Sequence, residues 1–484
     1  MRFKIHAELD ADNQEVFFYD NTTNTLSRHD GFVYEFEQQA IKPSRQIVTP
    51  FSKEQPLKKS RLVRHLKIQL GLSCNYACDY CSQRFVERAP ETNKRDIDGF
   101  IARLSNLMFD ENQGLRIELW GGEPLVYWKT LKPLTLALKE KFKDWSRPPS
   151  FLMITNGSLL TPTICDWLYD QGFNIAISHD AMGQSVRGPD PLEDSEQRQI
   201  ILDFYRRMRP EGRISFNSML HASNTSRKAI QEWFVALTDD PDVPLGEGSL
   251  VDSYDEGGYE NSLRTKAEHF AFRQQAFNDI YSTGGAIGFG GILEKIDGFT
   301  RSVLSHHPSE ALGQKCGMDN PHTIAVDLRG NVITCQNVSA VQTSMNGESH
   351  LAGAIDDIDN VSVRTATHWA NRPDCASCPV LHICQGSCMF VEGKHWEASC
   401  QNAYSDNIAL FALAFEKITG GYIPTYVEAD HLPPERRDIW GTVLAHTEEP
   451  HRKPFPVKVS VERTTLNEIE VYKRPQIAAE QLTP

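Results

Sequence analysis

The sequence predicts an α/β protein whose main unit is an open barrel or a doubly wound sheet of parallel strands. Short apolar segments alternate with helical patterns from residue 62 to about 255, as expected for parallel strands joined by crossover helices. With 484 residues and 40% hydrophobic content, the chain can bury the core of such a unit. Cysteines are dense from 316 to 400, where secondary structure is hard to recognise, as in a region organised by metal.

Six short apolar runs are the predicted strands of this unit: 62–72, 115–122, 150–157, 173–180, 213–221 and 245–254. Amphipathic helices are predicted between them, for example over 95–109, where apolar residues recur at helical spacing from Ile97 to Met108. In barrel folds the loops that follow the carboxyl ends of the strands carry the catalytic residues. We therefore expect the functional residues after the strand ends.

The flanking segments differ from this pattern. Two short strands, 2–9 and 15–20, predict a hairpin, and 49–61 has the charge and proline content of a linker. Helices are predicted over 259–282 and 403–420, with a glycine-rich loop over 283–293. We expect four parts: a β-hairpin appendage and linker (1–61), the barrel (62–300), a cysteine-rich domain (301–420) and a charged tail (421–484).

Charge and composition exclude several classes of partner. The chain has 50 Lys and Arg against 64 Asp and Glu, a net charge of -14, and no basic run that would suit nucleic acid. Its start lacks the pattern of a signal peptide, and no stretch is long and apolar enough to span a bilayer. We expect a cytoplasmic protein that binds neither nucleic acid nor membrane. Thiols stay reduced in that compartment, so metal binding is the preferred interpretation of its eleven cysteines.

Three cysteines, Cys74, Cys78 and Cys81, follow the first predicted strand in a polar loop. A zinc site would need a fourth ligand, for which Asp79 and Glu87 are the nearest candidates. A 4Fe-4S cluster held by three thiolates instead leaves one iron open to a small-molecule ligand. The second interpretation turns the missing ligand into a binding site.

The spacing Cys-x3-Cys-x2-Cys, with the aromatic Tyr80 before the last cysteine, resembles the radical S-adenosylmethionine (radical SAM) enzymes. The segment GGEP that follows the second strand is similar to the family's contact with the methionyl amino group of the cofactor. Glycines allow backbone carbonyls to approach an ammonium group closely, and the glutamate supplies charge. The resemblance implies that Gly121, Gly122 and Glu123 bind the cofactor.

Further contacts are implied by the same resemblance. Ser178, in ISHDA at the fourth strand end, resembles the family's ribose contact, and Arg187 is expected to face either the cofactor carboxylate or solvent. Asp180, Asn156 and Asn217 are weaker candidates, since each can also cap a turn. The implied fold is a partial (β/α)6 TIM-like barrel, and the implied chemistry is reductive cleavage of S-adenosylmethionine to a 5′-deoxyadenosyl radical that abstracts a hydrogen atom from substrate.

Seven more cysteines lie between 316 and 400, too many for one tetrahedral zinc site and one too few for two. With Gly330, their order resembles the SPASM (twitch-type) extension of radical SAM enzymes, which holds two auxiliary 4Fe-4S clusters. By resemblance, one cluster would take Cys316, Cys335 and Cys388, and the other Cys375, Cys378, Cys384 and Cys400. The first set leaves an open iron or takes a non-thiolate ligand, for which Asp319 and His322 are candidates. The remaining cysteine, Cys165, is interpreted as packing on a helix.

Enzymes with this extension mostly modify peptides, so the resemblance implies an oxidoreductase that acts on a ribosomally made precursor peptide. Sulfatase-maturing relatives carry Asp after the second SPASM cysteine, where this chain has Gln336. This departure favours oxidative crosslinking, as a thioether, a carbon-carbon cyclophane or an ether, over formylglycine formation. A non-catalytic iron-sulfur electron carrier or zinc scaffold is the alternative from another class.

Two further partners are expected. One is a reductant such as flavodoxin or ferredoxin. The other concerns the leader of the precursor peptide: either the N-terminal hairpin binds it by strand addition, or a separate leader-binding protein does. In the latter case the hairpin covers a barrel edge. The sequence does not identify a catalytic acid or base.

Overall fold

The computed structural model describes residues 1–36, 47–83, 92–344, 347–364 and 367–442, together with the backbone of 462–466 and 469–473. Its largest sheet has nine strands in the order β10-β9-β8-β7-β6-β5-β11-β12-β13. Six of them are the predicted barrel strands: β5 (His65–Gln69), β6 (Arg116–Trp120), β7 (Ser150–Thr155), β8 (Phe173–Ser178), β9 (Ile214–Leu220) and β10 (Leu245–Leu250). Each pairs with the next in parallel, so the predicted parallel α/β unit is confirmed.

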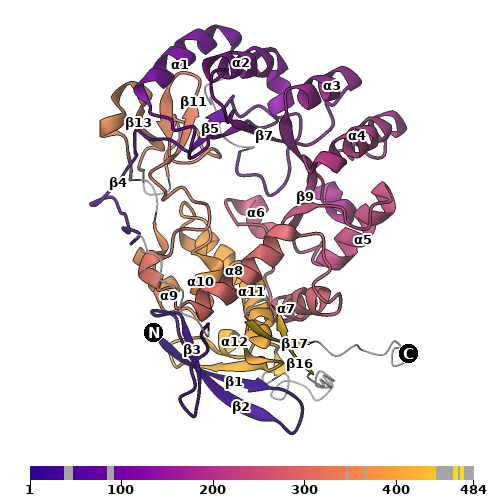
Figure 1. Ribbon diagram of the computed structural model, residues 1–484, viewed down its shortest axis with the longest axis vertical. Coiled ribbons are helices and arrows are strands. Elements are labelled where there is room, and N and C mark those ends of the chain that lie inside the picture. The colour runs from indigo at the N-terminus through magenta and orange to yellow at the C-terminus, as the bar shows by residue number, and fades with distance from the viewer. Residues whose placement is uncertain are drawn as a thin grey trace.

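Five helices pack on the outside of this curved sheet (Figure 1): α1 (Ile97–Arg103), α2 (Trp128–Lys141), α3 (Pro162–Asp170), α4 (Ser195–Met208) and α5 (Arg227–Thr238). Thr161, Asp194 and Ser226 cap the last three with side-chain hydrogen bonds to backbone N–H groups, which fixes where these helices begin. Cys165 is buried on α3, as predicted.

The cysteine-rich region continues the barrel sheet, which the sequence did not indicate. Strand β11 (Thr323–Asp327) pairs with β5 in parallel, and β12 (Asn331–Ile333) and β13 (Leu351–Ala354) follow in antiparallel order. All five residues of β11 are buried. A short sheet of β4 (Leu57–Lys58) and β14 (Ser362–Val363) joins the linker to this region. The thiols after β11 are thereby fixed relative to those after β5.

A helical layer lies below the barrel: α6 (Glu256–Glu260), α7 (Lys266–Tyr281), α8 (Gly290–Leu304), α9 (Pro373–Ala376), α10 (Leu381–Cys384), α11 (Gly393–Thr419) and α12 (Pro434–Arg437). The segment predicted as one helix over 259–282 is broken between α6 and α7, where Thr265 forms a capping box. The predicted glycine loop ends at Phe289, and α8 continues from there. Helix α11 begins ten residues before the predicted 403–420 and includes Cys400.

The N-terminal strands form a second sheet, in the order β15-β1-β2-β3. The predicted hairpin, β1 (Arg2–Glu8) with β2 (Gln14–Asp20), is confirmed; β3 (Thr25–Arg28) and β15 (Ile423–Glu428) flank it. Phe17 and Tyr19 pack edge-on against Phe415 and Phe411 of α11, with ring centroids 5.0 and 5.5 Å apart. This sheet therefore covers α11, and the expectation that the hairpin covers a barrel edge is wrong.

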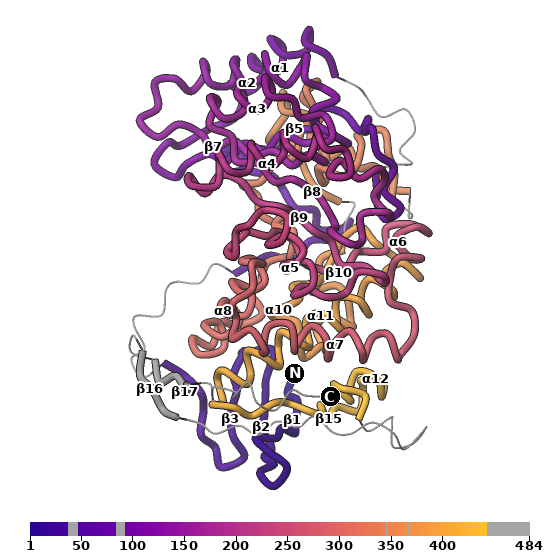
Figure 2. Tube along the Cα trace, turned by 90° about the vertical axis from the view of Figure 1, so that its right-hand side faces the viewer, coloured from indigo at the N-terminus to yellow at the C-terminus, as the bar shows by residue number. Residues whose placement is uncertain are grey.

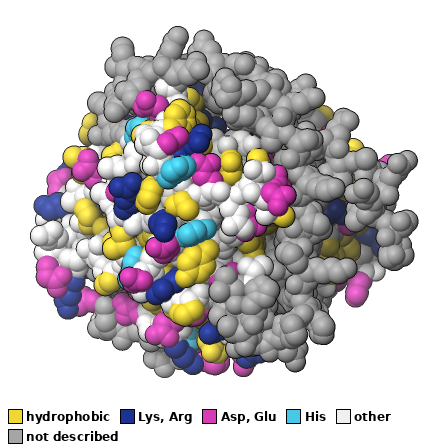
Figure 3. Space-filling view, turned by 90° about the horizontal axis from the view of Figure 1, so that it is seen from below, with side chains coloured by type: hydrophobic (Ala, Val, Ile, Leu, Met, Phe, Trp, Pro, Cys, Tyr) yellow, Lys and Arg dark blue, Asp and Glu magenta, His cyan; other side chains and the backbone are white. Residues whose placement is uncertain are grey.

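Figure 2 shows the barrel, the helical layer and the N-terminal sheet as three tiers along the long axis. On the coloured part of the lower face, acidic, basic and apolar side chains are interspersed (Figure 3). Within the described part of the chain, no helix has the length and hydropathy needed to cross a membrane. The backbone of β16 (Glu462–Leu466) and β17 (Ile469–Lys473) forms an antiparallel pair.

Candidate active site

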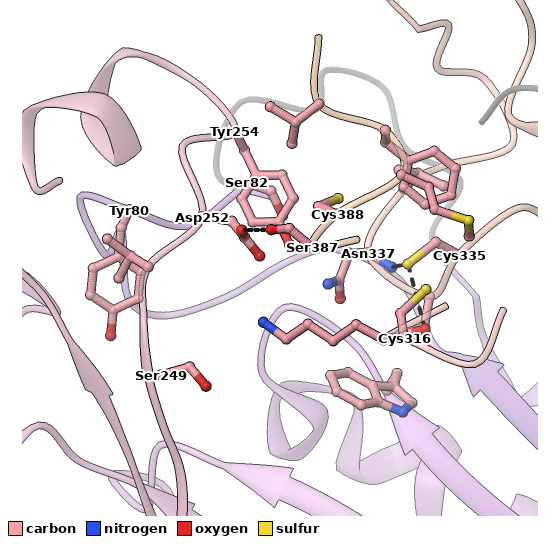
Figure 4. A pocket seen from close by; sticks show the side chains of 18 of the residues that line it. Tyr80, Ser82, Ser249, Asp252, Tyr254, Cys316, Cys335, Asn337, Ser387 and Cys388 are labelled. Atoms are coloured by element: carbon pink, nitrogen blue, oxygen red, sulfur yellow. Dashed lines mark hydrogen bonds between the residues drawn. The ribbon is translucent and has the colours of Figure 1, made fainter. Parts of the chain in front are cut away.

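A cavity of about 680 Å³ lies between the barrel interior and the cysteine-rich region. Figure 4 shows Tyr80 on one side of it and Cys316, Cys335 and Cys388 on the other. Ser178, Arg187 and Asn217 line the barrel side. The cavity therefore joins predicted cofactor contacts to one predicted set of auxiliary ligands.

The GGEP segment fastens the loop that carries the first three cysteines. The N–H groups of Gly122 and Glu123 donate to the carbonyls of Gly71 and Ser73, at 3.2 and 3.0 Å. A Cβ at position 122 would lie 2.5 Å from the carbonyl oxygens of Leu72 and Ser73, so only glycine fits there.

The side chain of Glu123 stabilises the contact between the GGEP segment and the cysteine loop. Its buried carboxylate accepts hydrogen bonds from the Thr155 hydroxyl at 2.8 Å and from the backbone N–H of Asn156 at 2.7 Å and Leu125 at 3.0 Å. Burial raises the pKa of Glu123, and these hydrogen bonds oppose the rise. The glutamate therefore fixes the ends of β6 and β7 around the cysteine loop, a role that the sequence did not reveal.

The thiols of Cys74, Cys78 and Cys81 lie close enough to influence one another electrostatically. Burial raises the pKa of Cys78 to about 11, and the Arg187 cation acts in the opposite direction. Asn156, a weak cofactor candidate, holds this loop by donating to the Asn75 side chain at 2.9 Å. Among the described residues, no three His, Cys, Asp or Glu side chains converge on a single-ion site, and Glu87 lies outside that part of the chain.

Tyr80, Asp180 and Arg187 form a buried polar network next to this loop. The Tyr80 hydroxyl donates to Asp180 Oδ2 at 2.5 Å and accepts from Arg187 Nη1 at 2.7 Å. Asp180 also accepts from the backbone N–H of Met219 at 2.9 Å. The buried Nε of Arg187 has no hydrogen-bond partner among the described residues. Arg187 also lines the cavity, and a guanidinium is the group that a cofactor carboxylate needs.

Ser178 ends β8 and stands opposite Asn217 of β9 in the parallel register. Both line the cavity. By contrast, the carboxylate of Asp180 is hydrogen bonded within the network of Tyr80 and Arg187, and the amide of Asn156 is hydrogen bonded to Asn75 of the cysteine loop. The structure thus separates the candidates into residues that reach the cavity and residues that support its wall.

The floor of the cavity contains a charged cluster that the sequence analysis missed. The buried carboxylate of Glu118 lies 2.9 Å from His65 Nε2, 2.8 Å from Arg116 Nε and 3.6 Å from Lys67 Nζ, and accepts from Trp120 Nε1 at 2.8 Å. Burial opposes ionisation of Glu118, but the His65 hydrogen bond and the Lys67 charge outweigh it and lower its pKa to about 2. The feature of the sequence that could have indicated this cluster is the presence of charged residues inside otherwise apolar strands.

Cys316, Cys335 and Cys388, here called the three-thiol site, line the cavity together. Gln69 Nε2 holds the Cys335 loop by donating to the carbonyls of Gln336 and Val338 at 2.7 and 2.8 Å. Burial raises the pKa of Cys335 to about 12. Tyr254, a further residue that the sequence did not indicate, lines the cavity beside Cys388 (Figure 4).

The two candidates for a non-thiolate ligand lie elsewhere. Asp319 accepts the backbone N–H of Gln314 at 2.7 Å, and His322 Nδ1 is 2.8 Å from the Leu62 carbonyl. Neither lines the cavity. Tyr254 and Asp252 are among the oxygen-bearing side chains that line the cavity with Cys388 (Figure 4).

Cys375, Cys378, Cys384 and Cys400, here called the four-thiol site, line a separate cavity of about 20 Å³ whose other walls are mostly apolar. Arg436 Nη2 donates to the Cys400 sulfur at 3.2 Å. Ser387 lines both cavities, since the loop 384–388 begins in one set and ends in the other. The structure gathers the seven thiols into the same two groups that the resemblance implies, although the ligand assignment itself stays a prediction.

These donor sets fit the groups that the resemblance implies. Seven thiols divided between two cavities suit iron-sulfur clusters, whose thiolates bind separate irons. The Arg187 guanidinium, which lines the cavity, suits the carboxylate of S-adenosylmethionine.

Comparisons with known proteins agree with this geometry, although no protein-family model matches the chain. The chain is 24% identical over 173 residues to the radical SAM cyclopropyl synthase TigE of Paramaledivibacter caminithermalis, covering 33% of this chain and 35% of TigE. It is 25% identical over 171 residues to an S-adenosylmethionine-dependent nucleotide dehydratase of Pseudoalteromonas ulvae, covering 31% of this chain and 54% of that protein. The match thus spans about a third and about half of these two relatives.

Solved structures show the fold over a larger part of the chain. The structure of anSMEcpe with bound AdoMet aligns with a TM-score of 0.51 at 15% identity, covering 73% of this chain and 99% of that one. The complex of anSMEcpe with AdoMet and Cp18Cys peptide aligns with a TM-score of 0.50 at the same identity and coverage. The chain therefore has the radical SAM partial-barrel fold with a cysteine-rich extension. In sequence it resembles radical SAM enzymes, and in fold it resembles anSMEcpe.

Proposed function

We propose that the protein is a radical SAM peptide maturase that crosslinks side chains of a ribosomally made precursor peptide by oxidation. The observation that carries this proposal is the shared cavity, because it brings Ser178 and Arg187 into one space with the three-thiol site. The anSMEcpe complex, whose fold this chain shares, holds both AdoMet and a peptide, which supports a peptide as the substrate class.

The residues have separate roles in this proposal. Cys74, Cys78 and Cys81 would hold one 4Fe-4S cluster. The cofactor contacts would be Tyr80, Gly121, Gly122, Glu123, Ser178 and Arg187. When bound, this cluster and S-adenosylmethionine supply a 5′-deoxyadenosyl radical that removes a hydrogen atom from the substrate. Arg187 would orient the cofactor through its guanidinium, and the hydrogen bonds of Glu123 would keep the cysteine loop in place.

The seven remaining thiols would hold two auxiliary clusters, which makes three clusters in all. Crosslinking removes two hydrogens from the peptide, so an electron and a proton must leave after the first hydrogen atom. The three-thiol site lies on the cavity, where an electron acceptor is needed. Only three residues separate Cys388 from Cys384 of the four-thiol site, so the loop 384–388 is a short covalent path between the two sites.

Strand addition to the N-terminal sheet is not the favoured way to bind the peptide leader. Val33 bridges to Ser27 on the outer side of β3, and Asp438 bridges to Tyr426 on the outer side of β15. Because segments of the same chain already pair with both outer strands, we favour a separate leader-binding protein. A flavodoxin or ferredoxin would supply electrons.

Anaerobic preparation of the full chain tests this proposal. Three clusters would give about twelve irons per chain. Addition of S-adenosylmethionine and dithionite should yield 5′-deoxyadenosine, and the triple variant C74A/C78A/C81A should yield none while it keeps the auxiliary clusters. Zinc in place of iron, or iron without 5′-deoxyadenosine, would favour a scaffold or an electron carrier instead.

The substrate is tested by co-expression with a short peptide encoded beside the gene, followed by mass spectrometry. Crosslinking predicts the loss of two hydrogens for each bond formed. Formylglycine is the second candidate product, and a Cys or Ser converted to an aldehyde would identify it. Gln336 argues against that product, because its amide lines the cavity where the sulfatase-maturing relatives carry Asp.

A further inference from the structure

The four-thiol site is covered by a segment that the sequence analysis treated only as a tail. Helix α12 places Arg436 against it, with the side chain buried. Its Nη2 donates to the Cys400 sulfur at 3.2 Å, and its Nε donates to Gln401 Oε1 at 3.3 Å. The guanidinium carbon lies 4.9 Å from the centre of the Tyr404 ring, whose hydroxyl donates to the Arg436 carbonyl at 2.5 Å. The guanidinium is therefore held in one position.

Arg436 has no carboxylate partner within the described part of the chain. The nearest cation, Arg273, directs its donors to the carbonyls of Glu435 and Asp438, which surround Arg436. The neighbours that can carry negative charge are the thiols of Cys400 and Cys378. A buried cation without a counter-charge destabilises the fold, as does a buried ion pair that has lost one partner. Thiols carry the required charge when they are ionised, which is their state in a metal-thiolate cluster.

Other cations surround the same site. Arg372 stacks over Trp396 at 3.6 Å, and its buried Nε has no hydrogen-bond partner among the described residues. It faces thiols of both sets electrostatically, and Lys295 and Lys315 do the same for Cys384. Lys315 also lines the large cavity and precedes Cys316, so both sites have nearby cations. The four-thiol site is distinguished by a guanidinium that donates to one of its sulfurs, whereas Asp252 acts on Cys388 and Asp319 acts on Cys316 at the three-thiol site.

We propose that Arg436 is the charge-compensating donor of the four-thiol site, and that it holds the cluster there at a higher reduction potential than the three-thiol site. Reduction potentials of iron-sulfur clusters rise with nearby positive charge and with hydrogen bonds to the sulfurs. An electron that enters at the cavity would then pass down to the four-thiol site. This inference rests on the proposed function only in that both sites hold clusters. Arg436 acts through Cys400 and is a positioning residue.

The test is an EPR-monitored redox titration of the reconstituted full chain without substrate. The signal of the four-thiol site is identified as the one that C384A removes. R436Q is expected to keep the iron content and shift the midpoint potential of that signal downward, and R436K, which restores the charge, should recover most of the shift. R437Q is the matched control, because Arg437 lies on the same helix and its donors go to the carbonyls of Leu432 and Asp430. It should shift neither signal.

An unchanged potential in R436Q at full iron content would overturn the inference. If R436Q loses iron at the four-thiol site alone, the potential is measured in R436K, which keeps the charge and should stay close to the unaltered value. A potential in R436K far below that of the unaltered protein would overturn the charge-compensating role. The titration needs neither S-adenosylmethionine nor peptide. Absence of iron would therefore count against the proposed function, whereas unmoved potentials in an iron-loaded protein would count against Arg436 alone.

Discussion

The three-thiol and four-thiol sites both consist of cysteine thiols, but their environments are opposite. The first opens onto a cavity of about 680 Å³ whose walls include charged, polar and apolar side chains, and its Cys316 is exposed. The second lies in a cavity of about 20 Å³ with mostly apolar walls and is covered by α11 and α12. The set that lacks a fourth thiol is the set that meets the cavity. Under the proposed function, the open site would face the substrate and the enclosed site would store an electron.

The largest expected effect concerns the polar floor below the three-thiol site. Glu118→Gln removes a buried, ionised carboxylate and leaves Lys67 and His65 without their partner. We expect a loss of about 3 kcal/mol in the free energy of unfolding, measured by urea denaturation at neutral pH. The matched control is Arg116→Gln, which removes a partner that is 55% exposed. It should cost less than about 1 kcal/mol. Equal losses in the two variants would contradict the assignment of Glu118 as the centre of the cluster.

The pH dependence of the same residue follows from its pKa. The pKa of Glu118 falls from 4.5 to about 2 on folding, so its ionised form stabilises the fold. This contribution is fully present above pH 4.5 and disappears as the pH falls through about 2. The stability difference between the unaltered protein and E118Q should therefore shrink over this range. A constant difference down to pH 2 would contradict the lowered pKa.

The second prediction compares how firmly the two sites hold iron. In C74A/C78A/C81A protein only the auxiliary clusters remain, and a chelator should remove iron in two phases of about four irons each. The faster phase belongs to the three-thiol site, because its cavity admits solvent and reagent. Iron release is followed by absorbance. The fast phase should be missing from C388A protein, and its persistence there would reverse the comparison.

The smallest effect is expected from Tyr254→Phe, which removes a hydroxyl group that lines the cavity with Cys388. The dipole of a neutral hydroxyl acts on a cluster less strongly than the full charge of a guanidinium that donates to a sulfur. The potential of the three-thiol signal should fall by less than R436Q lowers that of the four-thiol signal. Tyr259→Phe, on the neighbouring helix α6, should move neither. Equal shifts of both signals in Y254F would show that the sites are not electrostatically separate.

The sequence predicted the elements whose signal is local. The six barrel strands are apolar runs bounded by turn residues, and all six lie where they were expected. The start of α11 escaped prediction because its first turns carry Lys394, His395 and Glu397 without an apolar stripe. Strand β11 was not predicted, because five buried residues in a cysteine-rich segment do not indicate which sheet they join. The partner of the N-terminal hairpin, β15, lies near the other end of the chain.

The site shows the same division. The spacing of the cysteines in the chain predicted which thiols act together, since ligand spacing is a local property of loops. The charge around them was not predictable, because Lys67 reaches the three-thiol site from β5 and Arg436 reaches the four-thiol site from α12. The sequence by itself determined the parallel barrel, the division of seven thiols into a set of three and a set of four, and the resemblance to radical SAM enzymes. Only the tertiary structure decided which set opens onto the cavity and which lies among cations, because solvent access and electrostatic potential depend on side chains from distant segments.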